Sequence, residues 1–436
     1  MKRAIIITLL VAALLLVLAG IAAAVFFAAN RGFPTNNPFD QRNISSQLQE
    51  SKTLTVDTEK PLTLKVASAA GDVTITGANV DTVQVKVVKI AYDSSQSRAD
   101  EEVKDIKYTI EQNGNTITLK YELPKSMNFS NNVNTVNFDV TLPNEVTLDI
   151  DGSMGVINVA GTKGNVDIKN DFGNVTIEEI EGALTVQTSS GEVEAISIVA
   201  GDENIDLRSD FGGVTLKKAN GKDIILNSSS GPITLSEIHA TGDINTNTDF
   251  GNTDVENGSS DSLSAETNSG RVSLVKVRVN KEIKVQDDFG DIGLEQASAS
   301  SYDLHTNSGS ITASSPKGKL KAYTDYGGIN IENAQDVTLD LKTSSGSVEF
   351  SGSLGAGPHI VSSDFGEIDL TLPADSHLNV DLSTDFGNIN SDLPITVTLN
   401  GNSNSDGDQV VGDINGGGEQ ITAQTNSGSV NLHIGE

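Results

Sequence analysis

The chain has 436 residues, no cysteine and no tryptophan, and its 29 Lys and Arg against 59 Asp and Glu give a net charge of −30. The lack of cysteine excludes disulfides and thiolate metal sites, and the negative charge makes nucleic acid a poor partner. The 41 glycines and long tracts of Ser, Thr, Asn, Asp and Val are typical of strands and turns rather than of helices.

The N-terminus, residues 1–29, predicts a membrane anchor. Residues 4–29 form an uncharged, mostly apolar stretch directly after Lys2 and Arg3. About 20 apolar residues in a helix cross a bilayer, whereas the apolar core of a signal peptide is shorter, at roughly 7–15 residues. We therefore expect a retained single-pass anchor in the cell membrane, with a cleaved signal as the alternative. The positive-inside rule places the N-terminus in the cytoplasm and the rest of the chain outside it.

Three kinds of segment follow the anchor. Residues 30–50 contain two prolines and no periodicity, and they predict a stalk or linker. Residues 51–150 alternate apolar and polar residues and predict an irregular β entry region, with one short helix near 97–106. Residues 151–395 predict regular β-solenoid repeats, and residues 396–436 predict a loop and C-terminal capping strands.

The repeat is marked by the tripeptide Asp-aromatic-Gly. Its aromatic residues are Phe172, Phe211, Phe250, Phe289, Tyr326, Phe365 and Phe386. Ser-Ser-Gly or Asn-Ser-Gly lies between consecutive copies, except between the last two. The chain is therefore expected to be an all-β, right-handed parallel β-solenoid with a repeat of about 39 residues in two halves of about 19–20. One coil could contain the whole repeat, which would stack the aromatic residues in a ladder. Alternatively, one coil could contain half of it, so that Phe and Ser alternate in one column.

Side-chain alternation predicts the orientation of each corner. In an extended strand Ile205, Leu207, Ser209 and Phe211 share one face, and Ser230 occupies the position that corresponds to Phe211 in the next half repeat. We expect the aromatic side chains to point inward as structural corner residues and the glycine to turn the chain.

The aspartates that directly precede the aromatic residues lie on the opposite face of the extended strand and are expected to point outward. They are Asp171, Asp210, Asp249, Asp288, Asp325, Asp364 and Asp385. Each carboxylate could accept hydrogen bonds from the N–H groups of its turn, or the seven could form a column that holds Ca²⁺. We favour the turn interpretation, because the tract lacks the glycine-rich nonapeptide of calcium-binding β-rolls.

No catalytic or cofactor-binding residue can be assigned. Asp-Phe-Gly is also the magnesium-binding tripeptide of protein kinases, but the phosphate loop, strand lysine and catalytic loop of a kinase are missing. His239, His305, His359, His377 and His433 have no ligand spacing. A polysaccharide-acting β-helix enzyme would need a cluster of charged and aromatic side chains that interrupts the repeat, and the sequence offers none.

Several segments resemble a known family. The segment FDVTLPNEVTLDIDGSMGVINV and the repeated pattern L-x-V-x-T-S-S-G-x-V are similar to the bacterial and archaeal putative-adhesin (toastrack) family, from about Lys52 to the C-terminus. The resemblance implies a right-handed parallel β-solenoid at the cell surface, and it supplies no agreed catalytic residues.

The sequence thus favours a membrane-anchored, extracytoplasmic β-solenoid that acts as an adhesin-like binding or scaffold protein. Its partners would be the membrane, through residues 4–29, and a cell-wall polymer, surface glycan or surface protein. An envelope-stress sensing or partner-docking module for other membrane proteins is the main alternative, and a polysaccharide-acting enzyme is a third.

Overall fold

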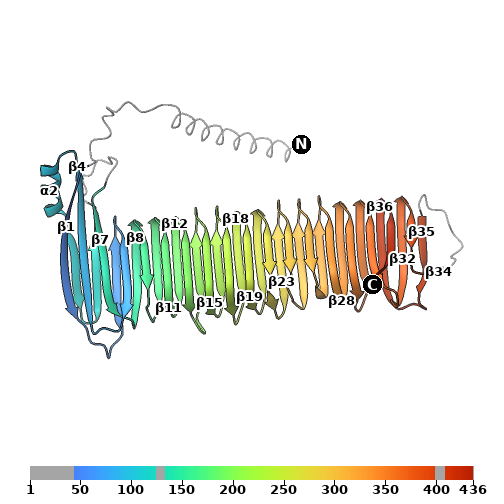
Figure 1. The fold of residues 1–436 in the computed structure, drawn as a ribbon, viewed down its shortest axis with the longest axis horizontal. Coiled ribbons are helices and arrows are strands. Elements are labelled where there is room, and N and C mark those ends of the chain that lie inside the picture. The colour runs from blue at the N-terminus through green and yellow to red at the C-terminus, as the bar shows by residue number, and fades with distance from the viewer. Residues whose placement is uncertain (1–43, 124–132, 398–407, 436) are drawn as a thin grey trace. The chain divides into compact units, whose positions relative to one another are not determined.

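The computed structural model describes residues 44–123, 133–397 and 408–435. The predicted anchor at 4–29 and most of the predicted stalk lie outside these residues. In the part that is described, no helix has the length and apolar composition needed to span a bilayer. The described residues are mostly strands, and those of the repeat pair in parallel from coil to coil (Figure 1). The prediction of an all-β parallel solenoid is therefore confirmed.

The chain divides into two units, of which the first comprises residues 1–48, 90–106 and 125–134. Its described part holds the start of β1 (Ile44–Thr55), the end of β4 (Thr82–Asp93) and the helix α2 (Gln96–Asp105). Ala99 and Val103 are the buried residues of α2. The short helix that the sequence predicts near 97–106 is thus confirmed.

The second unit comprises residues 49–89, 107–124 and 135–436, and its strands form two columns. In spatial order, the first column contains β6 (Thr116–Tyr121), β2 (Leu62–Ser68), β8 (Val146–Met154), β10 (Val166–Phe172), β12 (Leu184–Ser190), β14 (Ile205–Ser209), β16 (Ile224–Ser228), β18 (Ile244–Phe250), β20 (Leu263–Ser269), β23 (Glu282–Asp287), β25 (Ser301–Thr306), β27 (Lys317–Thr324), the second half of β28 (Ile329–Ser345), β30 (His359–Phe365), β36 (Glu419–Ser427) and β32 (Leu378–Phe386).

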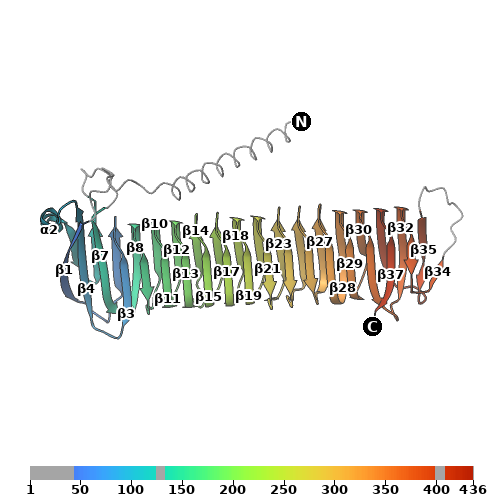
Figure 2. The ribbon, with the colours of Figure 1, turned by 45° about the horizontal axis from the view of Figure 1, so that its top comes forward.

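The strands of the second column follow those of the first after one corner. In spatial order they are β7 (Thr135–Pro143), β3 (Val73–Ala78), β9 (Ile157–Ala160), β11 (Val175–Glu181), β13 (Val193–Val199), β15 (Val214–Gly221), β17 (Ile233–Ala240), β19 (Thr253–Ser260), β21 (Val272–Val275), β24 (Ile292–Glu295), β26 (Ile311–Ser314), the first half of β28, β29 (Val348–Leu354), β31 (Ile368–Pro373), β37 (Val430–Gly435) and β33 (Ile389–Ser391), and β22 (Arg278–Val279) also pairs with β19. Figure 2 shows the strands of successive coils side by side.

The register of the first column sets the length of a coil. Val166 pairs with Leu184, Leu184 with Ile205, and Ile205 with Ile224. One coil therefore takes about 19–20 residues, and the 39-residue repeat of the sequence is two coils. Of the two coil lengths that the sequence left open, the shorter is the observed one.

The core lies between the two columns. Alternate residues of most strands in the two columns are buried, as in Ile205 and Leu207 of β14 and Val214 and Leu216 of β15. Because strands of one column are parallel and in register, each apolar residue stacks on its equivalent in the next coil. The alternation predicted from the sequence is thus the pattern that builds the core.

Both ends of the second unit contain strands out of chain order. The strand β2 lies between β6 and β8, and β36 lies between β30 and β32. At one end β5 (Tyr108–Asn113) pairs antiparallel with β6, and at the other β35 (Asp408–Ile414) pairs antiparallel with β32 and β34 (Ile395–Val397). Antiparallel strands at the ends interrupt the parallel stack, which discourages growth by further parallel pairing.

Candidate functional site

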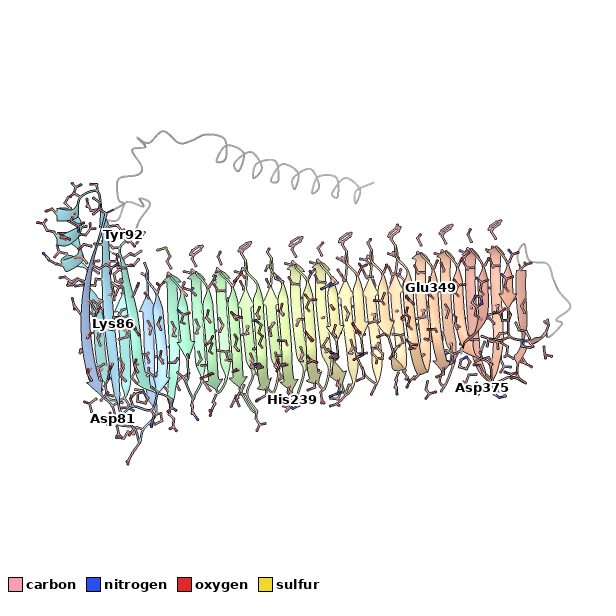
Figure 3. The ribbon with its side chains drawn as sticks, viewed as in Figure 1. Asp81, Lys86, Tyr92, His239, Glu349 and Asp375 are labelled. Carbon is pink, nitrogen blue, oxygen red and sulfur yellow. The ribbon has the colours of Figure 1, made fainter. Side chains whose placement is uncertain are left out.

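The aromatic residues of the repeat form a row of exposed side chains. All seven lie where a strand of the first column ends, and 59 to 77% of each residue is exposed. Figure 3 shows ring side chains standing along this edge of the coils, while the labelled His239 lies at the opposite edge. We call this row the aromatic edge: Phe172, Phe211, Phe250, Phe289, Tyr326, Phe365 and Phe386.

The prediction that these side chains point inward is wrong. Alternation holds as far as Ser209, which is buried, and Asp210, which is exposed, but Phe211 then breaks it. At the corner there is no interior space for a ring, because successive coils pack backbone against backbone. A Cβ placed on Gly212 would lie 2.0 Å from the carbonyl oxygen of Gly191 in the neighbouring coil. The corner therefore turns the aromatic side chain out into solvent.

Serine alternates with the aromatic residues along the edge. Phe172 pairs with Ser190, Phe250 pairs with Ser269, and Ser345 pairs with Phe365. Rings therefore recur every second coil, which corresponds to about 9–10 Å at the usual spacing of neighbouring strands. The same turn accepts either side chain, so the ring is not needed to form the corner.

The alternation continues where the sequence spacing breaks. Phe365 and Phe386 are the last two aromatic residues of the edge, and they follow each other without a serine tripeptide between them. In space β36 fills the gap, and Ser427 pairs with both Phe365 and Phe386. The two-coil interval between rings is thus kept by the topology although the sequence interval changes.

A second row of polar residues lies beneath the aromatic edge, two residues before each ring or serine. In ten coils this residue is a serine or threonine whose buried hydroxyl donates to the carbonyl oxygen of a corner glycine in an adjacent coil, as Thr306 does to Gly290 at 3.0 Å and Thr324 to Gly309 at 2.9 Å. The buried hydroxyl of Thr188, at the same position, has no partner among the described residues. We call this row the hydroxyl ladder. It contains Ser209, Ser228, Thr248, Thr267, Thr306, Thr324, Thr343, Ser363, Thr425 and Thr384. The alternation of side chains in the sequence predicts that Ser209 points inward, as observed, but it does not predict the hydrogen bonds from these hydroxyls to glycine carbonyl oxygens.

Asp287 occupies a ladder position in which the other coils of the aromatic edge, from β10 onward, place a hydroxyl or an amide. Its side chain is buried, Oδ1 accepts from the N–H of Phe289 at 3.1 Å, and Oδ2 has no partner among the described residues. Burial raises the pKa of the carboxyl to about 6, and the neighbouring carboxylates of Asp288 and Asp291 add to this rise.

The structure does not gather the seven predicted aspartates into a calcium site. They recur every second coil, like the rings, so neighbouring carboxylates are about 9–10 Å apart, whereas Ca²⁺ needs several oxygens within about 2.3–2.6 Å. Asparagine or serine lies between them: Asn268 donates to Asp249 at 3.0 Å and Asn307 to Asp288 at 2.8 Å. Across the described chain no group of three or more acidic or histidine side chains could hold a metal ion.

The seven aspartates form a polar border beside the aromatic edge. Asp171, Asp210, Asp364 and Asp385 are exposed, and Asp249, Asp288 and Asp325 are half-buried. At Asp249 and Asp288 the observed partners are side-chain amides from the next coil rather than the N–H groups of the same turn.

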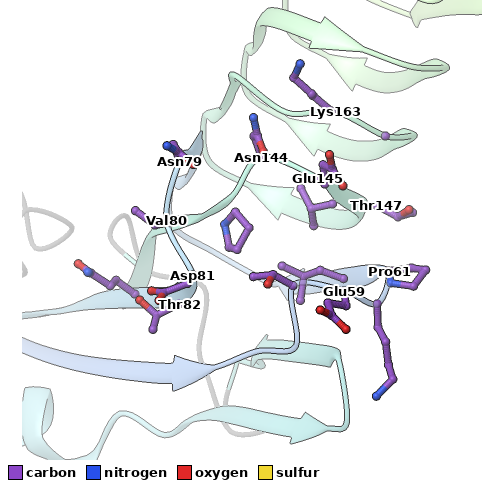
Figure 4. Close-up of a pocket in the computed structure, with 17 residues that line it drawn as sticks. Glu59, Pro61, Asn79, Val80, Asp81, Thr82, Asn144, Glu145, Thr147 and Lys163 are labelled. Carbon is purple, nitrogen blue, oxygen red and sulfur yellow. The ribbon is translucent and has the colours of Figure 1, made fainter.

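One hollow of the second unit lacks the pairing of histidine with serine or cysteine that many catalytic centres use. It has a volume of about 1180 Å³ and is lined by turns between strands (Figure 4). Its lining includes the acidic residues Glu59, Asp81 and Glu145, but no histidine, serine or cysteine. Its Lys163 is paired with Glu181 at 2.9 Å.

The chain is similar to proteins of one family. The model of the family Toastrack DUF4097 matches residues 63–259 and again residues 256–433. No curated protein matches the chain.

Three solved structures show similarity at low identity. A "putative cell adhesion protein" from Clostridium sporogenes is 10% identical with a TM-score of 0.19, over 89% of this chain and 100% of that one. A "putative adhesin" from Bacteroides fragilis is 15% identical with a TM-score of 0.28, over 66% and 98%. A "putative lipid binding protein" from Parabacteroides distasonis is 11% identical with a TM-score of 0.18, over 88% and 96%. Because the two family matches together cover most of the sequence, the chain belongs to the toastrack family.

Proposed function

We propose that the chain is a membrane-anchored, extracytoplasmic protein that binds a component of the cell surface and acts as an adhesin-like scaffold. The apolar stretch at 4–29 after Lys2 and Arg3 supports the anchor and the orientation. The solenoid supports the scaffold role, because a stack of coils presents the same surface chemistry many times along its length.

The observation that carries the binding role is the aromatic edge. An exposed ring gains nothing from burial in the core, and the serines at the alternate coils form the same corner without one. Exposed aromatic residues that are not needed for folding are typical of contact surfaces, because a ring gives a large contact area at a small entropic cost. The edge repeats this contact seven times.

Co-sedimentation of the full-length chain, kept in detergent micelles, with purified envelope fractions tests the proposal. We expect the chain to sediment with cell-wall or surface polymer, and we expect a chelator to leave this unchanged, because the aspartates do not form a calcium site. Recovery only with extracted membrane proteins would instead favour the partner-docking role. A chain that stays in the supernatant with every fraction would contradict the binding role.

A further inference from the structure

We infer that the aromatic edge binds a neutral, extended, β-linked polysaccharide, with one ring stacking on every second sugar. This inference rests on the proposed binding function and names the class of ligand. It is carried by the interval between the rings, by the polar groups on either side of them, and by the charge of the chain.

The interval between the rings selects a periodic ligand. The rings recur every second coil, at about 9–10 Å, and this interval is kept at Ser427, which lies between Phe365 and Phe386 in space but not in sequence. In an extended β-linked pyranose chain one sugar advances by about one strand spacing, and each sugar is turned over relative to the one before. Every second sugar therefore presents the same face at the interval that separates the rings.

The chemistry of the edge suits sugar rings better than an apolar protein surface. Each exposed ring provides a flat face for the C–H groups of a sugar, and the serine in the next coil provides a hydroxyl. The aspartates beside the rings accept hydrogen bonds, and asparagines such as Asn268 and Asn307 offer amide groups. Because serine interrupts the apolar surface at every other coil, the edge lacks the continuous apolar patch typical of protein interfaces.

The charge of the chain excludes an acidic polymer. The protein has a net charge of −30, and a carboxylate directly precedes every ring of the edge. An anionic polysaccharide laid along the edge would place its own charges beside these carboxylates, and the repulsion would oppose binding. A neutral polymer avoids this repulsion and can still donate hydroxyl hydrogens to the carboxylates.

Substitution of rings by serine provides a test that the fold already tolerates. In the triple variant Phe211→Ser, Phe250→Ser and Phe289→Ser, each new serine adopts a corner that Ser190 and Ser269 already form in the native chain. We expect the variant to keep the native circular dichroism spectrum and unfolding midpoint. The matched control carries Val199→Ser and Ile360→Ser, which remove exposed apolar side chains away from the edge.

Binding is measured for the full-length chain with cellulose and chitin particles, with polygalacturonate, and with chitosan. We expect the native chain to bind at least one of the two neutral polymers, the triple variant to bind it at least about tenfold more weakly, and the control to bind it as the native chain does. Replacing the same three rings by tyrosine, the residue that the edge has at Tyr326, should preserve binding. Affinity for soluble oligosaccharides of that polymer should rise in steps of two sugars, because each added pair engages one more ring.

The inference and the proposed function fail in different ways. If the native chain sediments with envelope fractions but binds neither neutral polymer, the polysaccharide inference is wrong and the binding role stands. Binding to polygalacturonate or chitosan alone would also overturn the inference, as would a folded triple variant that binds as tightly as the native chain. If the native chain binds no envelope fraction and no polymer, both fail.

Discussion

Replacing Asp287 by threonine should stabilise the protein at neutral pH and leave it nearly unchanged in acid. Asp287 is 3% exposed, and burial raises its pKa to about 6. In the unfolded chain the same group has the ordinary pKa of about 3.9. The two pKa values differ by about 2 units, and one unit corresponds to about 1.4 kcal/mol. Above pH 6, where the Asp287 carboxyl is ionised in the folded protein, it therefore lowers the free energy of unfolding by about 3 kcal/mol.

The sign of this effect follows from the order of the two pKa values. Below about pH 4 the Asp287 carboxyl is protonated in both states, so it causes no loss of stability. Between about pH 4 and pH 6 the unfolded chain loses the proton first, and the free energy of unfolding falls as the pH rises. Above about pH 6 the loss is complete. Threonine cannot ionise, and at this position in the neighbouring coils Thr267 and Thr306 donate to glycine carbonyls.

The assay is the urea midpoint, followed by far-UV circular dichroism, for the native chain and the Asp287→Thr variant. We expect the variant to be more stable by about 3 kcal/mol near pH 7.5 and by less than about 1 kcal/mol near pH 4. The control Glu282→Gln removes an exposed acid of the same strand, β23, and should have a small effect at both pH values. A gain of equal size at both pH values, or no gain at either, would refute the argument.

Three further predictions concern the corner, the hydroxyl ladder and the end of the stack. Gly270→Ala should destabilise the protein by about 2 kcal/mol or more in urea unfolding, because the new Cβ would lie 2.0 Å from the carbonyl oxygen of Gly251. The control is Gly293→Ala, whose Cβ would lie 3.6 Å from its nearest neighbouring atom, and this variant should be neutral or stabilised by about 0.5 kcal/mol. If both alanine variants lost the same free energy of unfolding, the account of the corner would be contradicted. Thr306→Val should lower the free energy of unfolding by about 1–2 kcal/mol, because the carbonyl of Gly290 loses its donor, and an unchanged midpoint would show that the ladder does not stabilise the corner. Deleting residues 395–414, which include β34 and β35, should expose the edge of β32 and cause self-association detectable by light scattering, and a variant that stays monomeric at all concentrations would show that β35 does not protect that edge.

Much of the fold is predictable because the solenoid repeats its sequence pattern. The alternation of Ile205, Leu207 and Ser209 predicts both the strand and its inward face, and the structure confirms both. The inward orientation of Phe211 was wrong because alternation applies only while the chain stays extended, and the chain leaves the strand at this corner. The same rule correctly places Asp287 inward. A comparison of the repeats would therefore have shown that this coil has an aspartate at a ladder position where neighbouring coils have threonine.

The remaining features depend on contacts that the sequence interval does not reveal. A 39-residue repeat is compatible with one coil or with two, and only strand pairings such as that of Phe172 with Ser190 show that it is two. The insertion of β36 between β30 and β32 joins Phe365 to Ser427, which are 62 residues apart. The spacing of the aromatic edge was hidden for both reasons, since it depends on the coil length and, at the last ring, on the insertion.

The most direct test of the aromatic edge is fluorine NMR of the full-length chain labelled with fluorophenylalanine. On titration with oligosaccharides of a neutral β-linked polymer, we expect the resonances of the exposed Phe172, Phe211, Phe250 and Phe289 to shift together. Those of Phe138 and Phe350, which are 1% and 2% exposed, should not move. Saturable binding that leaves the resonances of the edge unchanged would show that the ligand binds elsewhere and would contradict the account.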